Sequence, residues 1–82
     1  MTLLLASGMD IRKRIGANIR RLREEKGLSQ EDLGVDAQSG RTYVSELERG
    51  KRNATVTVVE KFAKVLGVTA GYLLDADPRK KP

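Results

Sequence analysis

The sequence predicts a small all-α domain of five short helices. Apolar residues recur at helical spacing in separate segments, and no segment sustains the alternation of a β-strand. Single glycines follow several of these segments, where they are typical of helix ends. A chain of 82 residues has room for one hydrophobic core, and that core must be largely aliphatic because only 4% of the residues are aromatic.

Helix boundaries follow from capping residues and glycines. Asp10 and Ser29 are typical N-caps, and Asp32 completes a near capping box with Ser29. The apolar stripe of the first helix consists of Ile11, Ile15, Ile19 and Leu22. On these signals we expect helices at residues 10–26, 29–37, 41–49, 56–67 and 69–74.

Residues 10–76 contain all of these helices and are expected to form the domain. Residues 1–9 are an apolar leader, expected to be poorly ordered or to precede an alternative translation start at Met9. The other interpretation of the leader is an extension that packs against the domain or a partner chain. Residues 77–82 are expected to form a disordered basic tail.

Composition narrows the class of function. The formal net charge of +5 suits a polyanionic partner, because each neutralised phosphate releases counterions. The absence of Cys and His excludes the usual zinc sites, thiol nucleophiles, histidine bases and disulfides. The apolar opening is far too short to span a membrane. We therefore expect a cytoplasmic protein that is not an enzyme and that needs no cofactor, metal or small-molecule ligand.

The segment from Ile19 to Gly50 has the length and spacing of a helix-turn-helix, the unit that sets its second helix into the DNA major groove. Apolar residues from the two helices and from the preceding segment can then face inward together: Leu22, Leu28, Leu33, Ala37, Val44 and Leu47. Small residues are needed where the helices approach, and Gly34 is one of them.

The outward face of the helix at residues 41–49 supplies the candidate base contacts. They are Arg41, Thr42, Tyr43, Ser45 and Glu46. Arg41 is the principal candidate, since a guanidinium binds guanine O6 and N7 bidentately. Glu46 would either accept a hydrogen bond from cytosine N4 or orient Arg41 or Arg49.

Three runs carry a resemblance to a known family: LREEKGLSQEDL, RTYVSELERGKRN and FAKVLGV. From Ile19 to Leu74, roughly two thirds of the chain, the sequence resembles the XRE/Cro-type, phage-repressor-like helix-turn-helix transcriptional regulators. The second run is particularly similar to restriction–modification controller proteins. Two places depart from the family. Gly34 stands where the family usually has Ala. In the turn, the family usually has Gly, then an apolar residue, then Ser or Thr as a cap, and here these three positions hold Gln38, Ser39 and Gly40.

The resemblance also implies contacts with the DNA backbone and one structural ion pair. The implied phosphate contacts are Ser29, Gln30, Arg49, Lys51, Arg52 and Asn53. For Ser29 and Gln30 we expect backbone N–H groups that point outward to a phosphate. Arg23 and Glu48 occupy positions that pair across the helices and clamp the recognition helix, and this pair could also aim Arg23 at a phosphate.

The helix at residues 56–67 has two neighbouring apolar faces, and one is enough for the core. Related domains pair about a two-fold axis in this region. The implied dimer interface is Val58, Val65, Tyr72 and Leu73. An unusually broad core contact is the competing explanation.

Together these features favour a homodimeric regulator of transcription that binds double-stranded DNA at a pseudo-palindromic operator. A bacterial or phage protein of the controller type, acting on its own promoter, fits the resemblance. A prophage repressor, an antitoxin or a protein-interaction module would share the same fold. The basic residues Arg41, Arg49, Lys51 and Arg52 argue against a module that has lost DNA binding.

Overall fold

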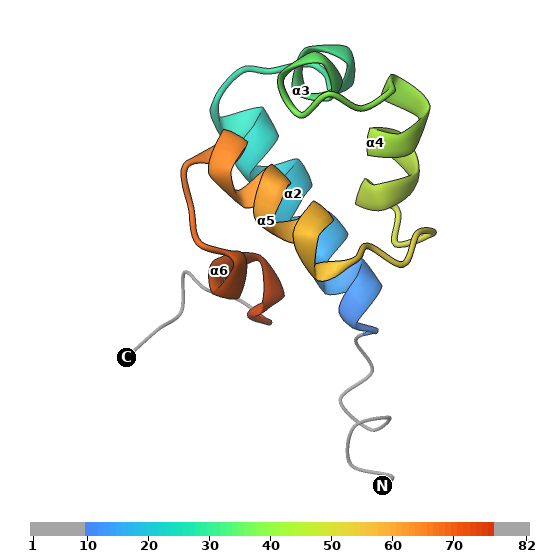
Figure 1. The fold of residues 1–82 in the computed structure, drawn as a ribbon, viewed down its shortest axis with the longest axis vertical. Coiled ribbons are helices and arrows are strands. Elements are labelled where there is room, and N and C mark those ends of the chain that lie inside the picture. Colours follow the sequence, from blue (N-terminus) through green and yellow to red (C-terminus); the bar gives the residue numbers. More distant parts are fainter. Residues whose placement is uncertain (1–9, 77–82) are drawn as a thin grey trace, which may run out of the picture.

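The computed structural model describes residues 10–76, and within that range it contains five α-helices and no strand (Figure 1). The helices are α2 (Ile11–Glu25), α3 (Gln30–Asp36), α4 (Arg41–Glu48), α5 (Val56–Leu66) and α6 (Ala70–Leu74). The expected all-α fold is confirmed, and each helix end lies within one residue of its prediction. The leader and the basic tail lie outside the described residues. No helix in the described range is both long and apolar enough to cross a membrane.

Local sequence explains where the helices begin. Asp10, Ser29, Thr55 and Thr69 are N-caps whose side-chain oxygens accept hydrogen bonds from the backbone of the first turn. At α3 the capping box is complete. Asp32 N donates to Ser29 Oγ at 3.0 Å, and Ser29 N donates to the Asp32 carboxylate at 3.1 Å. Helix α4 differs, because it starts at Gly40 without a side-chain cap.

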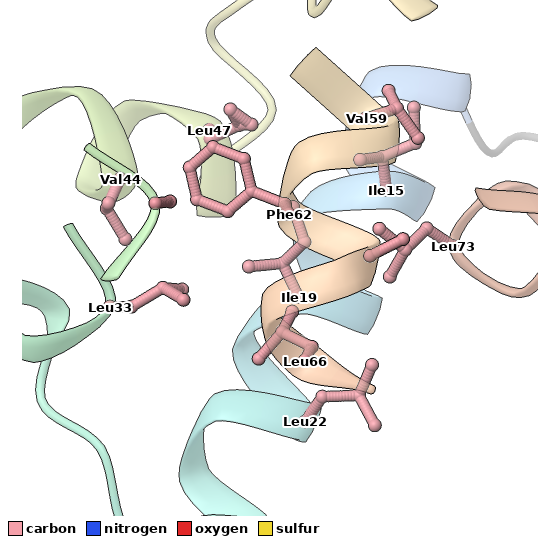
Figure 2. Packing of buried hydrophobic residues seen from close by; sticks show 12 residues of the cluster. Ile15, Ile19, Leu22, Leu33, Val44, Leu47, Val59, Phe62, Leu66 and Leu73 are labelled. Atoms are coloured by element: carbon pink, nitrogen blue, oxygen red, sulfur yellow. The ribbon is translucent and has the colours of Figure 1, made fainter. Parts of the chain in front are cut away.

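The hydrophobic core takes side chains from all five helices (Figure 2). Helices α2 and α5 lie at the centre of Figure 1, with α3 and α4 to one side and α6 to the other. Phe62 of α5 is fully buried, and its ring points toward α4 among aliphatic side chains. Leu28, which the sequence placed in this core, is only half-buried. The core is thus aliphatic apart from one central aromatic ring.

Gly16 allows α2 and α4 to approach closely. A Cβ at this position would overlap the carbonyl oxygens of Leu47 and Glu48, the second at 2.6 Å. Backbone oxygens cannot swing aside as a flexible side chain can. Gly16 therefore sets how deeply the C-terminal end of α4 sits on α2.

Asn18 fixes α6 to α2. Its side-chain amide is buried and donates to the carbonyl oxygens of Leu73 and Asp75, both at 2.9 Å. Its Oδ1 accepts from Arg21, which also donates to the Tyr72 hydroxyl at 2.8 Å. These bonds satisfy backbone carbonyls at the end of a five-residue helix that has few bonds of its own.

Candidate nucleic-acid interface

Helices α3 and α4 are joined by a tight turn at residues 37–40. Gln38 adopts a φ of +56°, a conformation that glycine tolerates better than other residues. Ser39 N donates to the Gly34 carbonyl at 2.6 Å, which folds the turn back onto α3. A Cβ on Gly34 would lie 2.7 Å from the Ser39 carbonyl oxygen. The turn therefore depends on glycine at position 34, so an alanine there would not fit this backbone although alanine is usual in the resembling family.

Helix α4 divides into a buried and an open face. Val44, Leu47 and Glu48 are buried. Among the candidate base contacts, Arg41 and Thr42 are exposed, whereas Tyr43, Ser45 and Glu46 are partly exposed. All of these candidates lie on one helix of eight residues, so a groove that accepts the helix would meet them together.

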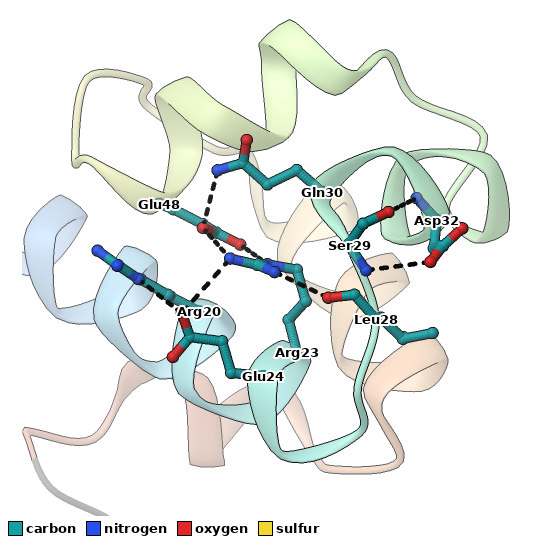
Figure 3. A network of polar contacts seen from close by, with 8 residues as sticks. All are labelled: Arg20, Arg23, Glu24, Leu28, Ser29, Gln30, Asp32 and Glu48. Atoms are coloured by element: carbon teal, nitrogen blue, oxygen red, sulfur yellow. Dashed lines mark hydrogen bonds and ion pairs between the residues drawn. The ribbon is translucent and has the colours of Figure 1, made fainter.

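The structure brings Arg23 and Glu48 together as a bidentate ion pair (Figure 3). Arg23 Nε lies 2.6 Å from Glu48 Oε2, and Arg23 Nη2 lies 3.1 Å from Oε1. Both side chains are nearly buried, with 11% and 3% of their surfaces exposed. The hydrogen bond to Glu48 raises the pKa of Arg23 above its ordinary value. A bidentate pair with so little exposure fixes the end of α4 against α2.

Two further bonds extend this pair to the segment around α3. Arg23 Nη1 donates to the Leu28 carbonyl at 2.8 Å, and Gln30 Nε2 donates to Glu48 Oε1 at 3.1 Å (Figure 3). All three guanidinium nitrogens of Arg23 are therefore engaged within the domain. One N–H on each of the two terminal nitrogens of Arg23 is left over, so the expectation that Arg23 also reaches a phosphate stays a prediction.

A second cluster joins α4 to the loop that follows it. Arg52 Nε donates to Glu46 Oε1 at 2.7 Å, and the Arg52 guanidinium carbon lies 4.9 Å from the centre of the Tyr43 ring. The Tyr43 ring lies 6.4 Å from the buried ring of Phe62. The sequence suggested Arg41 or Arg49 as a partner for Glu46, but in the structure its partner is Arg52.

The candidate phosphate contacts fall into two groups. Arg49, Lys51, Arg52 and Asn53 are exposed at the end of α4 and in the loop after it. At the start of α3 the expectation needs correction, because the Ser29 N–H is not free for a phosphate. It already donates to Asp32, whose carboxylate would repel an anion. Among the described residues the backbone N–H of Gln30 has no partner, so it stays a candidate phosphate donor together with the Ser29 hydroxyl and the second amide proton of Gln30.

The expected dimer interface needs correction at Leu73, and for its other three residues it stays a prediction. Leu73 is fully buried, so it belongs to the core rather than to a surplus surface. Val58 and Val65 are half-buried against the core, and the half-buried Tyr72 has Arg21 5.7 Å above its ring.

The apolar side chains that are exposed near these helices are others: Ile11, Val56 and Leu74, with 50%, 83% and 38% of their surfaces exposed. These three, here called the apolar patch, line one pocket of about 260 Å³ between α2, α5 and α6.

Sequence reasoning did not single out Gly16, Asn18 or Val56. Asn18 carried a signal, since it interrupts the apolar stripe of α2 three residues after Ile15. Gly16 carried none, because its close approach to α4 is a tertiary contact. Val56 was visible only as part of a β-branched run at the start of a helix.

The fold and the site define the helix-turn-helix class: two short helices joined by a tight turn, the second clamped to the domain with a polar face left open. The family model described as Helix-turn-helix, HTH_3, matches residues 19–73. The HTH-type transcriptional regulator y4dJ of Sinorhizobium fredii is 52% identical over 63 residues, which cover 74% of this chain and 79% of the relative. Control protein C.BamHI of Bacillus amyloliquefaciens is 42% identical over 67 residues, covering 80% and 83%.

A solved structure matches as well. The restriction–modification controller protein C.Esp1396I, a tetramer in complex with its natural 35 base-pair operator, superposes with a TM-score of 0.71 at 34% identity. The match covers 79% of this chain and 86% of that one. The chain belongs to the HTH_3, or XRE-type, family of DNA-binding transcription regulators and is related to the restriction–modification controller proteins. The resemblance read from the sequence is thereby confirmed.

Proposed function

We propose that the protein is a sequence-specific regulator of transcription that binds a pseudo-palindromic operator as a homodimer in the cytoplasm. The observation that carries the proposal is the open face of α4. The Arg23–Glu48 pair holds this helix on the domain, and its exposed Arg41 and Thr42 are free to reach base edges. A helix that is already fixed on the domain loses less conformational entropy when it binds.

Backbone contacts would supply most of the affinity. Arg49, Lys51 and Arg52 are exposed close to α4, so they can approach phosphates while α4 lies in the groove. Ser29 and Gln30 would add neutral hydrogen bonds from the start of α3. Binding of this kind weakens steeply as salt concentration rises.

One recognition helix reads too few base pairs to select a site in a genome, and a two-fold dimer doubles the number. We place the interface at the apolar patch rather than at Val65 and Tyr72, because the patch exposes more apolar surface. Val56 lines the pocket together with Ile11 and Leu74, and most of its side chain is exposed. A two-fold axis through this face would set the Val56 of each copy against the pocket of the other, as an isologous interface requires.

Sequence similarity to controller proteins supports an autoregulatory role at the protein's own promoter. The operator complex of C.Esp1396I supports DNA binding by an assembly of several copies. Control would then follow the concentration of the protein, since dimer formation and operator occupancy both depend on it.

Selection from a pool of random duplexes with the full chain tests the proposal. The expected product is a two-fold symmetric consensus whose half-site centres lie about 34–36 Å apart along the duplex. Affinity for the selected duplex should fall steeply between about 50 and 200 mM salt. A pool that is not enriched, or binding that salt does not affect, would favour a protein-interaction module instead.

A further inference from the structure

Three residues from α4 and the following loop form one unit on the surface that the proposed function assigns to DNA. We propose that Glu46 does not read a base but is a positioning residue. It holds Arg52 over the ring of Tyr43, so that Arg52 meets the DNA in one fixed orientation and discriminates between duplexes. This inference rests on the proposed function and assigns the roles of residues 43, 46 and 52 within it.

The geometry favours a positioning role because the contact uses one edge of Arg52. Glu46 accepts from Nε at 2.7 Å, and among the described residues neither terminal nitrogen of Arg52 has a hydrogen-bond partner. Those two nitrogens carry four N–H donors. An arginine held through Nε therefore keeps its terminal donors for an acceptor outside the protein.

Tyr43 provides the second constraint on Arg52. The guanidinium carbon lies 4.9 Å from the ring centre, within the range of a cation–π contact. The ring is itself tied to the core, since it packs 6.4 Å from fully buried Phe62. Arg52 is thus fixed between a charged partner and an aromatic surface that cannot move freely.

Charge explains why this arrangement favours discrimination over affinity. The side chains of Glu46 and Arg52 keep 31% and 49% of their surfaces exposed, on the side of the domain that carries Arg49 and Lys51. A carboxylate there repels the phosphates of any duplex, which lowers non-specific affinity. Its compensating effect would be to orient Arg52 toward an acceptor that only the cognate duplex presents at the right place.

A double-mutant cycle tests the proposal. Wild type, Glu46→Ala, Arg52→Ala and the double variant are titrated with the duplex selected by the wild type and with a scrambled duplex. Glu60→Ala is the control, because it removes an exposed carboxylate of α5 outside the unit. We expect Glu46→Ala to bind the scrambled duplex more tightly and to reduce the ratio of selected to scrambled affinity. We expect Glu46 and Arg52 to couple by about three- to tenfold on the selected duplex.

A measurement without DNA separates the inference from the proposed function. In the free protein, the side-chain protons of Arg52 next to its guanidinium should show a ring-current shift from Tyr43 that Glu46→Ala reduces and Glu60→Ala leaves unchanged. An unchanged shift in Glu46→Ala would overturn the positioning role. So would additive effects of the two substitutions on DNA, or a loss of preference at one cytosine that Arg52→Ala does not share. Wild-type protein that binds no duplex would overturn both this inference and the proposed function.

Discussion

Single atoms decide the geometry of the helix-turn-helix at Gly34. The turn carbonyl of Ser39 occupies the space that a side chain at residue 34 would need. Helix propensity alone would favour alanine over glycine by about 1 kcal/mol. Backbone overlap outweighs that preference here, because moving the turn also moves the start of α4.

Gly34→Ala should therefore lower the free energy of unfolding, by about 1–3 kcal/mol, as overpacking does in a tight site. Gly71→Ala is the matched control, since that helical glycine is exposed and a Cβ there meets only Thr69 Oγ1 at 3.8 Å. The control should be neutral or stabilise by about 0.5–1 kcal/mol. Urea unfolding of both variants is the measurement. A stabilised Gly34→Ala protein would show that the turn adapts without cost.

Asp10 gives the stability a defined pH dependence. The side chain of Arg12 hydrogen-bonds the Asp10 carboxylate at 2.7 Å and the Arg12 backbone N–H adds a second bond, and together they lower the pKa of Asp10 to about 2. A lowered carboxyl pKa stabilises the fold above the unfolded value of 3.8, and this contribution disappears as the pH falls through about 2.

The melting temperature of wild type should consequently fall more than that of Asp10→Asn between pH 5 and pH 2. Asparagine keeps an oxygen that can cap α2 but does not titrate. The pKa of Asp32 is also lowered, by its backbone and side-chain hydrogen bonds with Ser29, and it contributes equally in both proteins. Parallel melting curves across this range would mean that Asp10 does not contribute.

Between elements, the clamp of Arg23 and Glu48 is the principal polar contact of α4. Alanine at either residue should destabilise the fold by about 3–5 kcal/mol, because it leaves the other charge nearly buried and unpaired. In a cycle with the double variant, the two sites should couple by about 0.5–3 kcal/mol. Chemical denaturation gives these values. The exposed pair Arg20–Glu24 serves as the comparison and should couple much more weakly, although Glu24 also lies 3.8 Å from Arg23 Nη2. Equal coupling in the two pairs would mean that the Arg23–Glu48 pair stabilises the fold no more than an exposed ion pair does.

The elements themselves were readable from the sequence because their signals are local. Asp10 and Ser29 cap the helices that they were expected to cap. The apolar spacing of Val44 and Leu47 correctly gave the buried side of α4. Leu73 was misplaced because a helix of five residues is too short for periodicity to show which side is buried. Asn18, 55 residues away in sequence, decides its orientation instead.

The candidate site was predictable residue by residue but not as an arrangement. Arg41 and Thr42 were expected to be exposed, and they are. The contact of Glu46 with Arg52 was not foreseen, because the chain turns at Gly50, with a φ of +74°, before the loop returns to α4. The position of Arg52 depends on the backbone of this loop and on the contact with the Tyr43 ring, and residue spacing in the sequence predicts neither.

For the whole molecule, the proposed dimer should depend on the apolar patch. Val56→Asp should convert the dimer to a folded monomer, since it sets a charge in the apolar contact. Folding should survive because Val56 is the first residue of α5, where a carboxylate interacts favourably with the helix dipole. Sedimentation measures the oligomeric state. Val35→Asp, a change at an exposed valine of α3, should remain dimeric. A dimeric Val56→Asp protein would place the interface elsewhere.

The base preference of Arg41→Ala shows most directly whether the open face of α4 reads DNA. Duplex selection is performed in parallel with wild type and the variant. We expect Arg41→Ala to lose about 1–3 kcal/mol of binding free energy on the wild-type site and to relax the preference at one base position in each half-site. A variant that selects the same consensus with the same stringency would contradict it, because the exposed arginine at the start of α4 would then make no base contact.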